Sequence, residues 1–117
     1  MISLLSPRVT RSGAGPGPRS ARRSDRRRIS LLIGDGDAEF RRSLRARMEN
    51  DPQIDVVGEA DDGEVALQLA RWLRPDVALL DADMPCFGGA AIARILASEL
   101  PAVRVIVMTP PLGGGTP

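Results

Sequence analysis

The chain has 117 residues, the usual length of a single domain, and 43% of them are hydrophobic, an ordinary share for a globular protein. Its single cysteine, Cys86, excludes an internal disulfide. No apolar run approaches the roughly 18 residues that a membrane-spanning helix needs. These features predict a cytoplasmic protein that has neither a membrane segment nor a disulfide framework.

Charge is distributed very unevenly along the chain. Residues 1–28 carry eight Arg and one acid, a net charge of +7, whereas residues 29–117 carry eight Arg and fourteen acids, a net charge of −6. Residues 1–28 are also rich in Ser, Gly and Pro and poor in aliphatic side chains, so we expect a disordered extension there. Its arginines offer only phosphate contacts and no recognition helix is visible, so we expect no sequence-specific DNA binding.

From residue 29 onward, short β-like runs alternate with amphipathic stretches, which is typical of βαβ units and a parallel sheet. The predicted strands are residues 29–34, 54–59, 76–81 and 103–109. The last two are the most continuously apolar, as expected of strands covered on both faces. Residues 110–117 are rich in Pro and Gly and can continue neither a helix nor a central strand, so the predicted domain spans residues 29–109.

Three amphipathic helices are predicted between these strands. The first begins after Asp37 as N-cap. We expect it to turn one face to the sheet, through Phe40, Leu44 and Met48, and another to solvent, through Arg41, Arg42 and Arg45. The second follows Gly63 and ends before Pro75, and its predicted buried residues are Val65, Ala66, Leu69, Trp72 and Leu73. The third spans residues 89–100 and presents Ile92, Ile95 and Leu96.

Acidic residues follow two of the apolar runs at the points where the predicted strands end. The segment Asp35-Gly36-Asp37 follows the first strand, and Asp81, with Asp83 two residues later, ends the third. In an open parallel sheet the carboxyl ends of the strands line one crevice, where ligands collect. We therefore expect the two acidic loops to form one shared site.

The segment from Arg74 to Pro85, with Gly89 beyond it, resembles the part of bacterial response regulator receiver domains in which an aspartate at the end of the third strand accepts a phosphoryl group. Residues 58–67 and 103–109 are similar to the second and fourth βα units of receivers in LuxR/NarL-type regulators, which carry a C-terminal helix-turn-helix. The resemblance covers residues 29–109. It implies an α/β, flavodoxin-like doubly wound parallel sheet, truncated here after the fourth strand.

The same resemblance implies roles for individual residues. The chain would be a non-enzymatic receiver module that accepts a phosphoryl group from a sensor histidine kinase on Asp81. Such chemistry needs Mg²⁺ held by oxygen ligands. The implied ligands are the carboxylates of Asp35 and Asp81 and the backbone carbonyl of Asp83, and Thr109 would hydrogen-bond the phosphoryl oxygen.

The chain departs from the family pattern at positions that bear on this chemistry. Gly36 stands where the family has the second acid of its pair, which predicts a weakened Mg²⁺ site, while the neighbouring Asp37 is better placed to cap the helix than to bind metal. The family's fifth strand and its Lys are absent. Three interpretations stay open: a working phosphoacceptor, an unphosphorylated interaction module, and a truncated product without an independent role. An unpaired fourth strand would also favour self-association.

Overall fold

The computed structural model describes residues 28–110. In chain order its elements are β1 (Ile29–Gly34), α3 (Ala38–Glu49), β2 (Ile54–Ala60), α4 (Gly63–Leu73), β3 (Val77–Asp81), α5 (Gly89–Glu99) and β4 (Arg104–Met108). Each predicted strand and helix is present, and the bounds differ by at most one residue at either end. The extension predicted for residues 1–28 and the tail predicted for residues 110–117 lie, apart from Arg28 and Pro110, outside the described residues.

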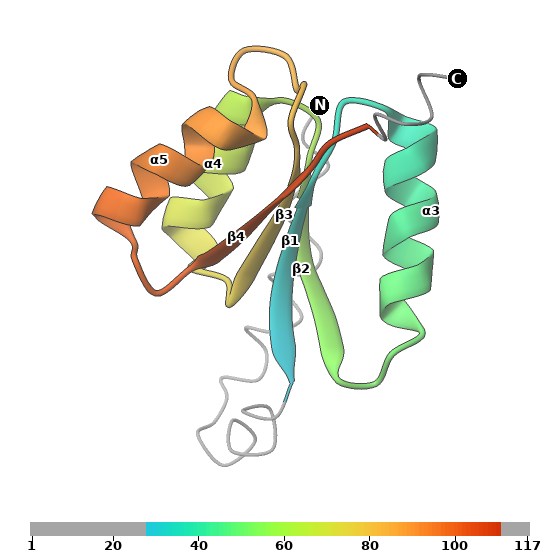
Figure 1. Cartoon of the computed structure of the whole chain (residues 1–117). Coiled ribbons are helices and arrows are strands. Elements are labelled where there is room, and N and C mark those ends of the chain that lie inside the picture. Colours follow the sequence, from blue (N-terminus) through green and yellow to red (C-terminus); the bar gives the residue numbers. More distant parts are fainter. Residues whose placement is uncertain (1–27, 111–117) are drawn as a thin grey trace.

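The four strands form one parallel sheet in the order β2-β1-β3-β4. Helix α3 covers one face of this sheet, and α4 and α5 cover the other (Figure 1). Strands that alternate with helices on both faces make the α/β, flavodoxin-like doubly wound arrangement that the sequence predicts. The carboxyl ends of β1 and β3, two neighbouring strands, therefore lie side by side at the same edge.

The larger core lies between the sheet and the α4/α5 layer. Leu32 of β1 and Leu80 of β3 are fully buried there against Ile92 and Leu96 of α5. Burying one such side chain stabilises a fold by about 1.5–3 kcal/mol. This core fixes β1 and β3 relative to each other, and thereby the two acidic loops that follow them.

The opposite face has a smaller core and is only partly covered. Leu44 and Met48 of α3 pack on the buried residues of β1 and β2, as predicted, yet no residue of α3 is itself buried. Phe40, predicted to pack on the sheet with them, is instead 47% exposed, so this part of the prediction is wrong. Among the described residues α3 is the sole helix on this face, so apolar side chains at its border remain in contact with water.

Two predictions about helix faces are also wrong. Trp72, predicted to lie in the core, is 61% exposed, because α4 buries the stripe around Ala66 and Ala70 and Trp72 falls on the other side of the helix. Leu67 is buried in its place. Arg41, predicted to face solvent, has a side chain only 12% exposed, because it forms an ion pair with Glu59 of β2.

The fourth strand is not covered on both faces as predicted. Its outer edge pairs with no strand among the described residues, and its burial is partial, with Arg104 and Ile106 exposed. Ile106 keeps 49% of its surface accessible. The apolar composition of β4 thus reflects packing against α5 on one side only.

Candidate functional site

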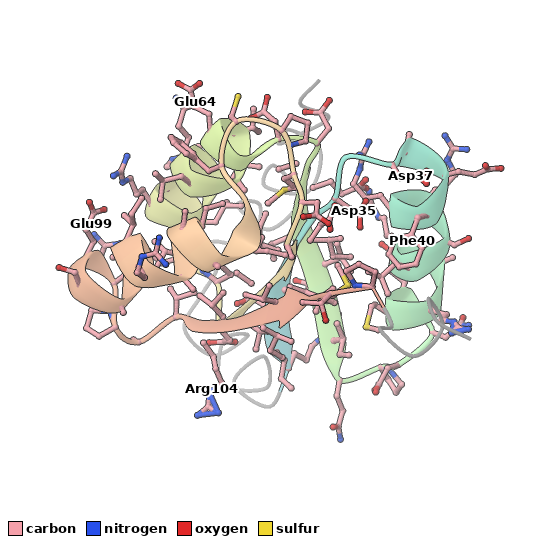
Figure 2. All side chains as sticks on the ribbon, turned by 45° about the horizontal axis from the view of Figure 1, so that its top comes forward. Asp35, Asp37, Phe40, Glu64, Glu99 and Arg104 are labelled. Atoms are coloured by element: carbon pink, nitrogen blue, oxygen red, sulfur yellow. The ribbon has the colours of Figure 1, made fainter. Side chains whose placement is uncertain are left out.

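Asp35, which follows β1, and Asp81, the last residue of β3, are brought together by the register of these strands. Gly34, the last residue of β1, pairs with Leu80, so Asp35 and Asp81 are the next residues of two adjacent parallel strands. Figure 2 shows Asp35 at this edge of the sheet, facing the start of α3. The structure therefore places both predicted acids at one site.

Asp35 is a buried carboxylate held on two sides. Its side chain and backbone are only 7% exposed, its N–H donates to the carbonyl of Ala60 at 3.0 Å, and its Oδ1 accepts the N–H of Asp37 at 2.9 Å. Burial raises the pKa of Asp35, the hydrogen bond from Asp37 opposes this, and the nearby charge of Asp81 raises the pKa further. A cation at this position would relieve both unfavourable effects.

Asp81 is half-buried, and its Oδ1 accepts the N–H of Asp83 at 3.1 Å. The loop that follows is tightly held: the N–H of Gly63 donates to the carbonyl of Pro85 at 2.9 Å, and a Cβ at Gly88 would lie 2.1 Å from the carbonyl oxygen of Ala82. These contacts fix the backbone beside Asp81. The carboxylate is thus oriented by its own loop.

Thr109 reaches the same edge through β4. Met108 pairs with Asp81 in register, and its carbonyl accepts the N–H of Ala82 at 2.9 Å. Thr109 follows immediately and is exposed. The four predicted site residues, Asp35, Asp81, Asp83 and Thr109, therefore stand at the carboxyl ends of three adjacent strands.

The structure decides between the two roles considered for Asp37. Its side chain accepts the N–H groups of Glu39 at 3.0 Å and Phe40 at 3.1 Å, so it is the N-cap of α3, as predicted. Gly36 is exposed beside Pro85 and contributes no side chain at this position. Within residues 28–110 there is no group of three or more His, Cys, Asp or Glu side chains able to hold a metal ion.

The donor set nevertheless fits Mg²⁺. This ion is commonly bound through one or two carboxylates, with water molecules and phosphate oxygens completing its octahedron. Asp35 and Asp81 provide two carboxylates within electrostatic reach of each other. A complete cage of protein ligands is not required for that coordination.

Arg41 is the site residue that the sequence prediction missed. Its Nη1 donates to the backbone carbonyl of Asp35 at 2.7 Å, and its Nε donates to Oε1 of Glu59 at 3.1 Å. Glu59 also pairs with Arg45, one turn further along α3. The signal was the i, i+4 spacing of the two arginines together with an acid in an otherwise apolar part of β2.

Comparisons with known proteins agree with this arrangement of the site. The family model of the response regulator receiver domain matches residues 31–111. Among curated proteins, the chain is 40% identical over 80 residues to a protein-glutamate methylesterase/protein-glutamine glutaminase of Halalkalibacterium halodurans, covering 68% of this chain and 23% of that protein. It is also 40% identical over 83 residues to the probable transcriptional regulatory protein NarL of Mycobacterium tuberculosis, covering 70% of this chain and 38% of NarL.

Solved structures give the same result. The signal receiver domain of the putative response regulator NarL from Mycobacterium tuberculosis superposes with a TM-score of 0.68 at 36% identity, covering 70% of this chain and 66% of that one. The response regulator domain of Thermotoga maritima CheB gives 0.67 at 32% identity, covering 71% and 61%.

The chain spans less than two fifths of the curated relatives, so their names describe proteins with further parts. No helix in residues 28–110 is long and apolar enough to cross a membrane. The order of the strands, the placement of Asp35 beside Asp81 and the match to the family model all indicate a receiver domain. The chain therefore belongs to the response regulator receiver domain family, the receiver modules of two-component phosphorelay signalling.

Proposed function

We propose that this receiver accepts a phosphoryl group on Asp81 from a sensor histidine kinase. The observation that carries the proposal is the register of β1 and β3, which sets Asp81 beside the buried Asp35 at the carboxyl edge of the sheet. Asp81 is half-buried and held by its own loop, so its carboxylate is both accessible and oriented. We propose a cytoplasmic location for this transfer.

The transfer is a displacement at phosphorus. An oxygen of Asp81 forms the new P–O bond while the bond between phosphorus and the donor nitrogen of a phosphohistidine breaks, and the nitrogen keeps the electron pair. Because Oδ1 already accepts the N–H of Asp83, we expect Oδ2 to attack. Such a reaction depends on positioning and charge neutralisation more than on acid–base groups.

Asp35, Asp81 and the backbone carbonyl of Asp83 are the proposed Mg²⁺ ligands, and bound Mg²⁺ would supply the charge neutralisation. The site is weaker than one with two adjacent acids, because Gly36 contributes no side chain. Thr109 is proposed to donate its hydroxyl to the phosphoryl oxygen, supported by its place directly after the residue that pairs with Asp81.

We also propose that the chain self-associates through β4. The outer edge of β4 has no partner strand in the described part of the chain, and the exposed Ile106 lies on it. An edge of this kind offers unpaired backbone donors and acceptors to a second strand. The Arg-rich residues 1–28 are proposed to be a separate extension without sequence-specific DNA binding.

The direct test is phosphorylation by acetyl phosphate with Mg²⁺, followed by intact-protein mass spectrometry. We expect one added phosphoryl group on the wild type and none on Asp81→Asn. Glu64→Gln, which removes an exposed acid of α4 at the same end of the molecule, is the matched control and should be labelled normally (Figure 2). Equal labelling of Asp81→Asn and wild type would refute the assignment.

A further inference from the structure

Arg41 joins three elements around the acidic loop after β1. It lies in α3, its side chain binds the backbone carbonyl of Asp35 at 2.7 Å, and the same guanidinium binds Glu59 of β2 at 3.1 Å. Its own backbone N–H donates to the carbonyl of Asp37 at 2.9 Å. One residue therefore holds the loop at two carbonyls, the first and last of the segment 35–37.

We propose that Arg41 is a positioning residue for phosphoryl transfer, which fixes the loop so that the carboxylate of Asp35 meets the metal shared with Asp81. This inference rests on the proposed function of the site. Arg41 touches neither the phosphoryl group nor the metal in this scheme. It acts through the backbone of Asp35.

The contacts of Asp35 show why such a support is needed. Its N–H is bonded to Ala60 of β2, and its carbonyl is bonded to Arg41, so the peptide groups on both sides of Asp35 are fixed by different elements. The next residue is Gly36, whose lack of a side chain leaves the loop without any packing of its own at that position. Without Arg41, the carbonyl of Asp35 would lose the hydrogen bond from Nη1, and the loop could rotate about Gly36.

Glu59 sets the orientation of the Arg41 guanidinium. The Glu59 side chain is 12% exposed and accepts from both Arg41 and Arg45, so its carboxylate is held by two cations. A guanidinium can bind a carboxylate through one nitrogen and a carbonyl through another in a fixed plane, whereas an ammonium is a single point of charge. Arg41→Lys should therefore keep the charge and restore only part of the positioning.

The importance of this support is greater here because Gly36 brings no second acid. Asp35 and Asp81 supply the only carboxylates proposed for the metal, so a displacement of Asp35 removes half of the side-chain ligands. Residues that orient a metal ligand from behind commonly contribute about 10–100-fold to metal affinity. We expect an effect of that size for Arg41→Met.

The first measurement uses metal-free protein and follows amide hydrogen exchange by NMR. The N–H of Asp37 is bonded to Oδ1 of Asp35, so its exchange reports whether the loop keeps its form. We expect Arg41→Met to accelerate exchange of Asp37 by about tenfold, while the core amide of Leu80 is unchanged. Arg42→Met, on the exposed side of the same helix, is the matched control and should change neither.

The second measurement is Mn²⁺ binding, with Mn²⁺ as the spectroscopic substitute for Mg²⁺. Arg41→Met should weaken binding by about 10–100-fold, Arg41→Lys by an intermediate factor, and Arg42→Met should bind like the wild type.

The outcomes separate this inference from the proposed function. Equal Mn²⁺ affinity of the wild type and Arg41→Met would overturn the positioning role alone. Faster exchange at every amide of Arg41→Met would also overturn it, because that result indicates a general loss of stability. A wild type that binds no Mn²⁺ would overturn the proposed metal site and this inference together.

Discussion

Replacing Gly63 by Ala tests the packing of the loop beside Asp81. Gly63 is the first residue of α4, and its N–H donates to the carbonyl of Pro85 at 2.9 Å. A Cβ at this position would lie 2.2 Å from the carbonyl oxygen of Phe87 and 2.6 Å from its Cβ. Since backbone atoms are involved, the start of α4 and the loop after β3 must move apart.

Helix propensity and packing predict opposite effects of Gly63→Ala on the free energy of unfolding. An alanine in place of a helical glycine gains about 1 kcal/mol by propensity alone. Accommodating the added Cβ in this packed region costs about 1–3 kcal/mol, and losing the hydrogen bond to Pro85 costs about 0.5–1.5 kcal/mol. We therefore expect Gly63→Ala to lower the free energy of unfolding by about 1–3 kcal/mol.

Urea unfolding followed by circular dichroism measures this free energy, with Gln68→Ala on the exposed side of α4 as the control. Under conditions in which Gly63→Ala is folded, labelling of Asp81 by acetyl phosphate should also slow, because the loop that orients Asp81 is displaced. An unfolding free energy equal to or above that of the wild type would refute the account of this loop.

Three further predictions concern the metal site and the sheet edge. Gly36→Asp adds the missing acid and should strengthen Mn²⁺ binding in a titration, at the cost of a small shift of Pro85, whose Cδ would lie 3.2 Å from the new Cβ; unchanged affinity would contradict the assignment of Gly36. Asp35→Asn should be more stable than the wild type at neutral pH in thermal melts. The folded-state pKa of Asp35 is raised above 3.8, so its charged carboxylate destabilises the fold at pH values above the raised pKa. The stability difference between Asp35→Asn and the wild type should therefore shrink as the pH falls through the raised pKa. A stability difference that grows toward acidic pH would contradict this reasoning. Ile106→Lys should reduce self-association in sedimentation experiments, and a wild type that is monomeric at all concentrations would exclude an interface at β4.

The sequence predicted the sheet and the two acidic loops because those signals are local. Each strand is a short apolar run that is followed within two residues by an acid or a proline, and helices α3 and α4 begin at the capping residues Asp37 and Asp62. The carboxyl ends of parallel strands lie at one edge of the sheet. That is why Asp35 and Asp81 could be assigned to one site from spacing and resemblance.

The errors concern side chains whose environment is set by distant parts of the chain. Trp72 matches an apolar helical pattern, but the small residues of α4 are the ones that approach the sheet. Arg41 is a charged residue of the kind that usually faces solvent. Its side chain is largely buried because it pairs with Glu59, which lies opposite it on β2. Phe40 is exposed because, in residues 28–110, nothing further covers its face of the sheet. Periodicity along one element contains none of this information.

The central claim is that Asp81 is the phosphoacceptor, and chemical trapping of the product tests it most directly. Borohydride reduces an aspartyl phosphate to homoserine, so peptide mapping after acetyl phosphate and Mg²⁺ treatment locates the modified residue. We predict homoserine at position 81 and at no other acid, with the yield lost when Mg²⁺ is chelated. Homoserine at Asp35, Asp37 or Asp83 instead of Asp81, or none at any position in folded protein, would contradict the account.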